Sequence, residues 1–196
     1  MVKRCFWKGM DNPLYQQYHD QEWGKLNLDE HYLYEMLVLE SFQSGLSWLT
    51  VLKKRENFRK AFADFDVDKV AAYGDEDVAR LMNDKGIIRN RRKIEAAIHN
   101  AQVFVKMHRD GQTMGQLLQR AVPDVIINHP RTMTDMPAQT ALSQRLSRQL
   151  KKVGFKFVGP VTVYSYLQAV GLVNDHLEDC DFKYGQPGQN NEEDKR

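Results

Sequence analysis

A single carboxylate, Glu40, lies inside the apolar run MLVLESFQSGLSW that extends from residue 36 to residue 48. If the run is helical, Leu33, Met36 and Leu37 share its face, because they precede it by seven, four and three residues. Burying an unpaired carboxylate is costly. The pattern therefore indicates either an ion pair with a neighbouring Arg or Lys, the more ordinary interpretation, or a site that binds a cation or a hydrogen-bond donor.

A second set of residues could hold a metal ion. Cys5 and His19 lie near the N-terminus, and His176 and Cys180 are spaced i, i+4 in HLEDC near the C-terminus. Two Cys and two His would make a closed tetrahedral site of the structural zinc type and would join the two ends. The alternative is that the pairs are unrelated, and a disulfide between two such distant cysteines is not expected.

Aromatic side chains are dense near the N-terminus and recur at residue 48. Clustered aromatics usually belong to a hydrophobic core. The alternative is a stacking pocket for a flat ligand such as a nucleobase, in which a buried carboxylate would favour a cation or an exocyclic amine. The members of the cluster are Phe6, Trp7, Tyr15, Tyr18, Trp23 and Trp48.

The stretch KKVGFKFVGPVTVYSYLQAVG predicts a helix, a turn bounded by Gly154 and Gly159, and a second helix that begins at Pro160. The unpaired N–H groups of that second helix, with lysines such as Lys156 nearby, suit a phosphate group. An ordinary connection between two helices with surface lysines is the alternative.

Helical periodicity extends over almost the whole chain, and no alternating run requires a sheet. The stretch NHPRTMTDMPAQ predicts a loop. The polar end GQPGQNNEEDKR should be disordered. We expect one all-α domain over residues 1–185 and a disordered tail over 186–196. One predicted helix runs from a cap at Asp29 to before Gly45, and the next from Ser47 to about Phe62. Two short helices are predicted to begin at Asp66 and Asp75. The remaining predicted helices cover residues 90–110, 113–121, 140–153 and 160 to about 171.

Composition and charge distribution limit the binding partners and the cellular location that the sequence allows. The chain has 196 residues and a formal net charge of +2, and its basic and acidic stretches are segregated, which allows one positive face for nucleic acid. It contains no run of about 18 apolar residues and no secretory leader pattern. We expect a cytoplasmic protein without a membrane partner. A monomer is the default, because no heptad pattern appears.

Five segments together resemble the bacterial DNA-3-methyladenine glycosylase I family. They are DNPLYQQYHDQEWG, LESFQSGLSWLTVLKKREN, GIIRNRRKI, GFKFVGPVTVYSYLQAVGLVNDH and the pair at residues 176 and 180. The resemblance covers roughly residues 4–180. It implies an all-α fold of the helix-hairpin-helix DNA glycosylase superfamily, in which Gly154, Lys156 and Gly159 contact DNA. It also implies alkylated double-stranded DNA as the partner and free 3-methyladenine as the product.

The same resemblance implies roles for single residues. Glu40 would be the catalytic residue that reads the excised base, beside Trp48 and Tyr18. Further lining of the base pocket is implied at Trp7, Tyr15, Trp23 and Ser165. One structural zinc ion would be held by Cys5, His19, His176 and Cys180.

The implied reaction is hydrolysis of an N-glycosidic bond. Methylation at N3 makes adenine cationic, so the base departs neutral and needs little general-acid assistance, unlike most glycoside hydrolysis. No Schiff-base lysine is indicated, which favours a monofunctional enzyme. One departure from the family is the segment Gly111–Val122, GQTMGQLLQRAV, which lacks the Phe and Trp of many relatives. Two alternatives stay open: a glycosylase for another alkylated base, and a non-catalytic DNA-binding module whose ends are joined by zinc.

Overall fold

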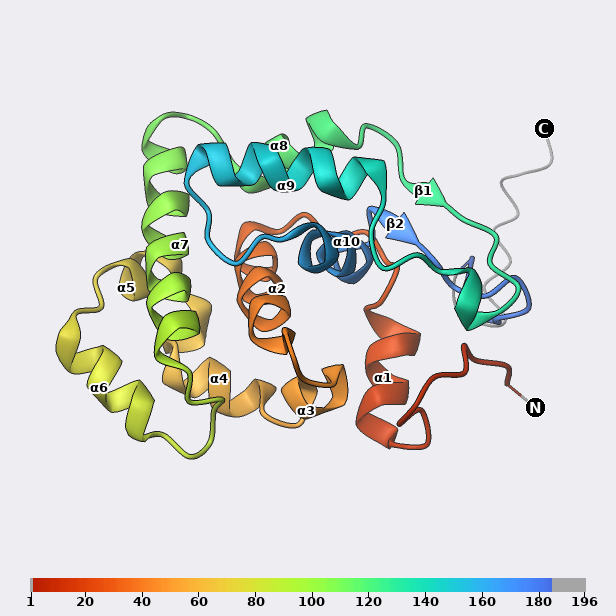
Figure 1. The fold of residues 1–196 in the computed structure, drawn as a ribbon, viewed down its shortest axis with the longest axis horizontal. Helices are drawn as coiled ribbons and strands as arrows, with labels where there is room; N and C mark the ends of the chain where they lie inside the picture. Colours follow the sequence, from red (N-terminus) through yellow and green to blue (C-terminus); the bar gives the residue numbers. More distant parts are fainter. Residues whose placement is uncertain (1, 185–196) are drawn as a thin grey trace.

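The computed structural model describes residues 2–184, and they fold mainly into helices (Figure 1). The expected disorder of residues 186–196 lies outside the described residues. In chain order the elements are α1 (Pro13–Gln21), α2 (Glu30–Gln43), α3 (Trp48–Leu52), α4 (Arg55–Ala61), the 3-10 turn η1 (Ala63–Phe65), α5 (Val67–Ala71), α6 (Asp75–Asn83), α7 (Arg91–Arg109), α8 (Met114–Ala121), β1 (Ile126–Ile127), the 3-10 turn η2 (Met133–Asp135), α9 (Ala141–Val153), α10 (Pro160–Ala169) and β2 (Val173–Asn174).

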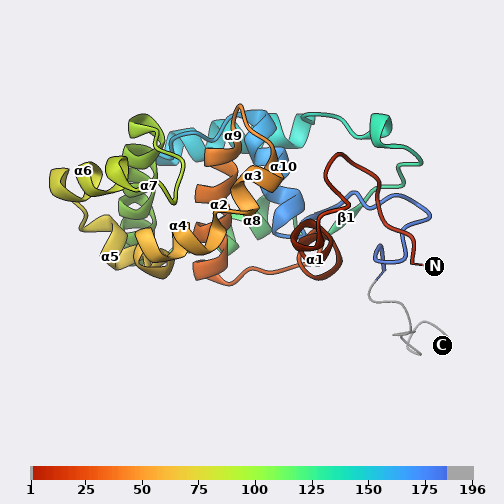
Figure 2. The same ribbon diagram turned by 90° about the horizontal axis from the view of Figure 1, so that it is seen from below.

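Helices α2 and α10 occupy the centre of the molecule, with α9 running beside them (Figure 1). Helices α5, α6 and α7 lie at one end, whereas α1, β1 and β2 lie at the other end with the N-terminal segment, and a perpendicular view shows the same division (Figure 2). Segments from opposite ends of the sequence are therefore close in space.

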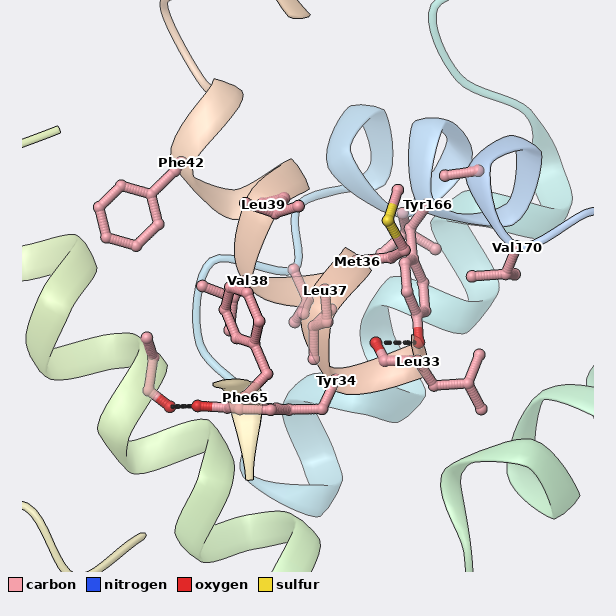
Figure 3. Packing of buried hydrophobic residues seen from close by; sticks show 14 of the residues in the cluster. Leu33, Tyr34, Met36, Leu37, Val38, Leu39, Phe42, Phe65, Tyr166 and Val170 are labelled. Carbon is pink, nitrogen blue, oxygen red and sulfur yellow. Dashed lines mark hydrogen bonds between the residues drawn. The ribbon is translucent and has the colours of Figure 1, made fainter. Parts of the chain in front are cut away.

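The core is built around α2, whose residues 33–42 are all buried. Two buried tyrosines pair their hydroxyls with backbone carbonyls (Figure 3): Tyr34 Oη donates to the oxygen of Ala97 at 3.0 Å and Tyr166 Oη to that of Leu33 at 2.9 Å. These bonds satisfy polar atoms that would otherwise be costly to bury. They also fix α2 against α7 and α10.

Most of the predicted helix starts are confirmed. In each, the side-chain oxygen of the residue before the helix accepts a backbone N–H of the first turn, which satisfies a donor that has no partner within the helix. The capping residues are Asp29, Ser47, Asp66, Asn90, Thr113 and Thr140. Asp75 is the first residue of α6, and Pro160 is the first residue of α10, as expected.

The single helix predicted from Ser47 to about Phe62 is wrong: α3 ends at Leu52 and α4 begins at Arg55. No glycine or proline marks the break. Tertiary contacts account for it, because Lys54 Nζ donates to the carbonyls of residues 85 and 86, and Arg55 donates to Glu22 and Glu35. These long-range contacts override the local helical preference.

One helix and one pair of short strands were not predicted. Helix α1 begins at Pro13 behind the cap Asn12, a start signal that is legible in the sequence. The parallel pair β1 and β2 aligns Ile126 with Val173, and two residues per strand are too few to leave an alternating pattern. Within residues 2–184, no helix combines the length and the apolar character needed to cross a membrane.

Candidate active site and metal centre

A cavity of about 320 Å³ lies between α1, α2, α3 and α10 and is bordered by the loop that contains η2. A cavity of this size suits a small organic ligand. It brings together all seven residues for which a pocket role was expected from the sequence. These are Trp7, Tyr15, Tyr18, Trp23, Glu40, Trp48 and Ser165.

Glu40 lies on α2 and is 5% exposed. Burial without a counter-charge raises the pKa of this carboxyl from its usual 4.5 to about 8. The ion pair that its sequence context also allowed forms at Glu35 instead, which accepts from Arg55 and Arg59 at 2.8 Å. Glu40 is thus the acidic group of α2 that faces the cavity.

Aromatic rings surround this carboxylate. Tyr18 and Trp48 have ring centroids 5.2 Å apart and planes tilted by 55°. Trp7 contacts Trp23 edge to face at 4.9 Å and Tyr15 at 5.5 Å. Burial and the nearby Glu40 charge raise the pKa of both the Tyr15 and the Tyr18 hydroxyls, so both rings stay neutral.

Three buried side-chain atoms have no hydrogen-bond partner within the described part of the chain: Glu40 Oε2, Trp7 Nε1 and Trp48 Nε1. All three belong to residues that line the cavity. Buried polar atoms in proteins are nearly always paired. One acceptor and two donors left together in an apolar cavity indicate a site made for a ligand with complementary polar edges.

Several cavity residues were not predicted. On α10, residues 161, 164 and 168 join Ser165 in the lining, and this i, i+3, i+4, i+7 spacing would have found them once one member was known. On α2, Gln43 lies one turn after Glu40. The loop contributes Met133, Met136, Pro137 and Ala138, for which the sequence offers no periodic signal.

The segment Gly111–Val122 does not line this cavity. It forms α8, whose N-terminal amides at residues 114 and 115 donate to the carboxylate of Glu30 at 3.1 and 2.7 Å. Glu30 begins α2, so the segment packs at the far end of the helix from Glu40. The loop that follows it does line the cavity, through residues such as Met133 and Met136.

Gly154, Lys156 and Gly159 lie in the turn between α9 and α10, outside the cavity lining. Gly154 has φ of 119°, in the left-handed region that favours glycine at the end of a helix. Gly159 precedes α10 without a side-chain cap, and the Lys156 side chain is exposed. The turn therefore presents backbone donors and a cation at the surface.

Cys5, His19, His176 and Cys180 are all buried, and one ligand atom of each lies within 4.8 Å of the others. Sulfur and nitrogen atoms of this set lie 3.4–3.6 Å apart, in the pairs Cys5–His176, Cys180–His19 and Cys180–His176. In a tetrahedral zinc site with Zn–S of about 2.3 Å and Zn–N of about 2.0 Å, such atoms lie about 3.5 Å apart. The donor set therefore fits zinc.

The outer nitrogens of both histidines are held. His19 Nδ1 lies 2.7 Å from Asp20 Oδ1, and His176 Nε2 lies 2.9 Å from the carbonyl oxygen of Trp23. A carboxylate or carbonyl partner of this kind orients a ligating imidazole. Both cysteines are free thiols. Hydrogen bonding between the two cysteines lowers the pKa of the Cys180 thiol and, with burial, raises that of Cys5, so Cys180 is the member of the pair that favours the thiolate that metals bind.

Comparison with known proteins decides the family. Residues 7–184 match the sequence model of the methyladenine glycosylase family. This chain belongs to the methyladenine glycosylase family. The family predicted from the sequence is confirmed.

Among its relatives, DNA-3-methyladenine glycosylase 1 of Escherichia coli strain K12 is 48% identical over 182 residues, which are 91% of this chain and 96% of that one. A crystal structure of 3-methyladenine DNA glycosylase I superposes with a TM-score of 0.88 at 45% identity, covering 91% and 98%. Another methyladenine glycosylase structure, in complex with 3-methyladenine, gives 0.86 at 38% identity, covering 91% and 96%. The mainly helical fold of this chain is therefore that of solved family members.

Proposed function

We propose that this methyladenine glycosylase removes N3-methyladenine from alkylated duplex DNA by hydrolysing its N-glycosidic bond, leaving an abasic site. The names of relatives with 42–48% identity support this reaction, as does a related structure that holds 3-methyladenine. The observation that carries the proposal is the buried, unpaired carboxylate of Glu40 in an aromatic cavity.

Charge complementarity explains the choice of base. N3-methylated adenine in DNA is a cation, and a carboxylate in a water-poor cavity attracts a cation more strongly than it would in water. We assign to Glu40 the acceptance of a hydrogen bond from the exocyclic amine. Trp48 and Tyr18 border the ring faces, while Trp7, Tyr15, Trp23 and Ser165 shape the remaining wall. Normal adenine is neutral and gains less from this cavity.

Little further chemical assistance is needed, because the base leaves as a neutral molecule. The enzyme must extrude the nucleotide, hold the base and leave room for water at the sugar C1′. No lysine lines the cavity within residues 2–184. This supports hydrolysis without a Schiff-base intermediate, and hence a monofunctional enzyme.

Duplex DNA binds, in this proposal, at the turn between α9 and α10, which we interpret as a helix-hairpin-helix element. Gly154 and Gly159 allow a phosphate to approach the backbone, and Lys156 adds a positive charge. A structural zinc ion held by Cys5, His19, His176 and Cys180 would join the chain ends and would take no part in the reaction. The cytoplasmic location and the monomeric state stay predictions.

The test is base release from methylated duplex DNA, resolved by chromatography, for the wild type and Glu40→Gln. This variant keeps the shape and removes the charge. We expect release of 3-methyladenine by the wild type and a loss on the order of 100-fold in the variant, the size seen when one stabilising group is removed from an active site. Glu56→Gln, at an exposed position on α4, is the matched control and should keep full activity.

The same chromatogram separates the alternatives. Preferential release of another base, such as 7-methylguanine, would assign the enzyme to a different alkylated base. DNA binding without any base release would identify a non-catalytic DNA-binding module. Equal activity of Glu40→Gln and the wild type would contradict the role of the carboxylate.

A further inference from the structure

The turn between α9 and α10 is held from its inner side by polar side chains of neighbouring helices. Asn100 of α7 is 1% exposed, and its Oδ1 accepts the Lys156 N–H at 2.8 Å while its Nδ2 donates to the Lys156 carbonyl at 3.0 Å. A side-chain amide thus pairs both backbone groups of one turn residue. Such a pair fixes the orientation of two peptide units.

Two further carbonyls of the turn are held in the same way. His99, also on α7, places Nε2 2.8 Å from the Gly154 oxygen. A carbonyl can only accept, so this nitrogen carries the proton. Ser147 of α9, 1% exposed, donates through Oγ to the Val158 oxygen at 2.5 Å. We call Asn100, His99 and Ser147 the inner clamp.

The inner clamp determines what the turn presents outward. In a planar trans peptide, the C=O and the following N–H point in opposite directions. Because the carbonyls of residues 156 and 158 point to the clamp, the N–H groups of Phe157 and Gly159 point away from the residues that hold those carbonyls. No backbone acceptor among the described residues pairs with the N–H of Phe157, Val158 or Gly159.

The backbone of the α9–α10 turn is strained at one residue. Phe157 has φ of 56°, a left-handed conformation that is uncommon for an aromatic residue. Such conformations persist where the surroundings over-determine them, and they cluster at ligand-binding segments. The clamp supplies that constraint from the inner side, which leaves the outer side free for a phosphate.

We propose that Asn100 and His99 are positioning residues for DNA binding: by fixing the carbonyls of the α9–α10 turn inward, they hold its N–H groups ready for a DNA phosphate. The inference rests on the proposed function, since it assumes that the turn binds the DNA backbone. No α7 residue among the described residues lines the base cavity. The proposal therefore gives α7 a part in substrate binding that the cavity alone does not indicate.

The test compares variants that remove a clamp hydrogen bond with one that restores it. Asn100→Leu removes both of its bonds, and His99→Phe removes one, whereas His99→Gln keeps an N–H donor for the Gly154 carbonyl. Gln102→Leu is the matched control, because Gln102 lies on the same helix and donates to the Ala71 carbonyl, away from the turn.

Each purified variant is measured for affinity to a duplex that carries an abasic-site analogue, for affinity to free 3-methyladenine, and for kcat and KM of base release. We expect Asn100→Leu and His99→Phe to raise the Kd for duplex, and KM, by about fivefold to tenfold, as loss of one or two hydrogen bonds allows. Affinity for the free base and kcat should not change. His99→Gln and Gln102→Leu should stay within about twofold of the wild type.

Unchanged duplex affinity in folded Asn100→Leu and His99→Phe would overturn the proposal, and so would an equal loss of duplex and free-base affinity, which would show a general structural role. If Asn100→Leu does not fold, the comparison of His99→Phe with His99→Gln, at a half-buried position, tests the proposal by itself. Failure of the wild type to release 3-methyladenine would overturn the proposed function instead, and the two failures are therefore distinguishable.

Discussion

The Glu40 carboxylate lies where water cannot stabilise its charge, and no protein group among the described residues replaces that water at Oε2. Its pKa is therefore raised to about 8 by burial. Around neutral pH a large share of the free enzyme carries this carboxyl protonated. A cationic base in the cavity would favour the ionised form and lower the same pKa.

A pH dependence of the reaction follows. If the ionised carboxylate binds the cation, kcat/KM, which reports the free enzyme, should rise with pH up to about 8 and then become level. The profile of kcat, which reports the complex, should become level at lower pH. Steady-state base release between pH 5.5 and 9.5, at substrate concentrations below and above KM, measures both, and a Glu40→Gln variant that keeps the same rising limb would contradict the assignment.

The same group should make folding stability depend on pH. The unfolded state loses the Glu40 proton near the usual pKa of 4.5, whereas the folded state keeps it to about 8. Stability is thus greatest below 4.5 for this group and falls as pH rises through 8. Glu40→Gln should be more stable than the wild type at pH 8.5 and nearly equal at pH 5, measured by urea unfolding. Parallel stability profiles for the two proteins would exclude this linkage.

At this scale the sequence predicted much of the site. Glu40 is recognisable because a charge interrupts an apolar helical face, a conflict that is expected at functional sites. The unpaired indole nitrogens of Trp7 and Trp48 could not be predicted in the same way. Whether such a nitrogen has a hydrogen-bond partner depends on neighbours that are distant in sequence. Met133 and Met136 lie on a loop whose course no local pattern fixes. These details required the three-dimensional structure.

Among the elements, α10 links the cavity to the candidate metal centre. Tyr164 and Gln168 line the cavity, and both donate to Asp175 Oδ2 at 2.6 Å, while Asn128 donates to Oδ1 at 2.6 Å. Asp175 is 1% exposed and directly precedes His176. One buried carboxylate therefore orders the α10 wall of the cavity.

Replacing Asp175 by Asn should disturb this wall, because the amide nitrogen would face a donor. We expect a loss of about 1–3 kcal/mol in the free energy of unfolding and a weaker affinity for free 3-methyladenine. Denaturant unfolding and fluorescence titration measure the two effects. Asp179→Asn, at an exposed position nearby, should change stability by less than about 0.5 kcal/mol. Equal behaviour of the two variants would contradict the role of Asp175.

The elements themselves were predicted where capping and periodicity agree, as for α2 behind Asp29 and α10 from Pro160. The break between α3 and α4 was missed because Arg55 and Lys54 respond to partners that are distant in sequence. Helix α1 was missed although Asn12 and Pro13 carry a start signal. Local patterns thus gave the helices that carry Glu40 and Ser165, while their relative placement depends on packing.

Over the whole molecule, the two ends of the chain meet beside the cavity. Trp7 and Trp23 line the cavity, while Cys5 and His19 belong to the buried cluster that could hold a metal ion. The His176 ring contacts the Trp23 ring edge to face, at a centroid distance of 4.6 Å. The candidate metal centre and the cavity therefore share a wall. The sequence indicated the four ligands by residue type but could not show that they meet.

If zinc occupies this cluster, as proposed, its loss should loosen the ends of the chain. A bound ion closes a loop of nearly the whole chain, and a crosslink of that length contributes up to about 5 kcal/mol by constraining the unfolded state. We expect Cys180→Ser to lower the melting temperature by on the order of 10 °C and to abolish stoichiometric zinc, measured by calorimetry and metal analysis.

His129→Ala, which changes an exposed histidine outside the four ligands, should alter neither. Because Glu40 is not a ligand, folded Cys180→Ser at low temperature should still release 3-methyladenine. An unchanged melting temperature, with no zinc in the purified wild type, would contradict the metal centre and leave the packing and hydrogen bonds between the two segments, such as the backbone pair of Lys3 and Asp181, as what joins them.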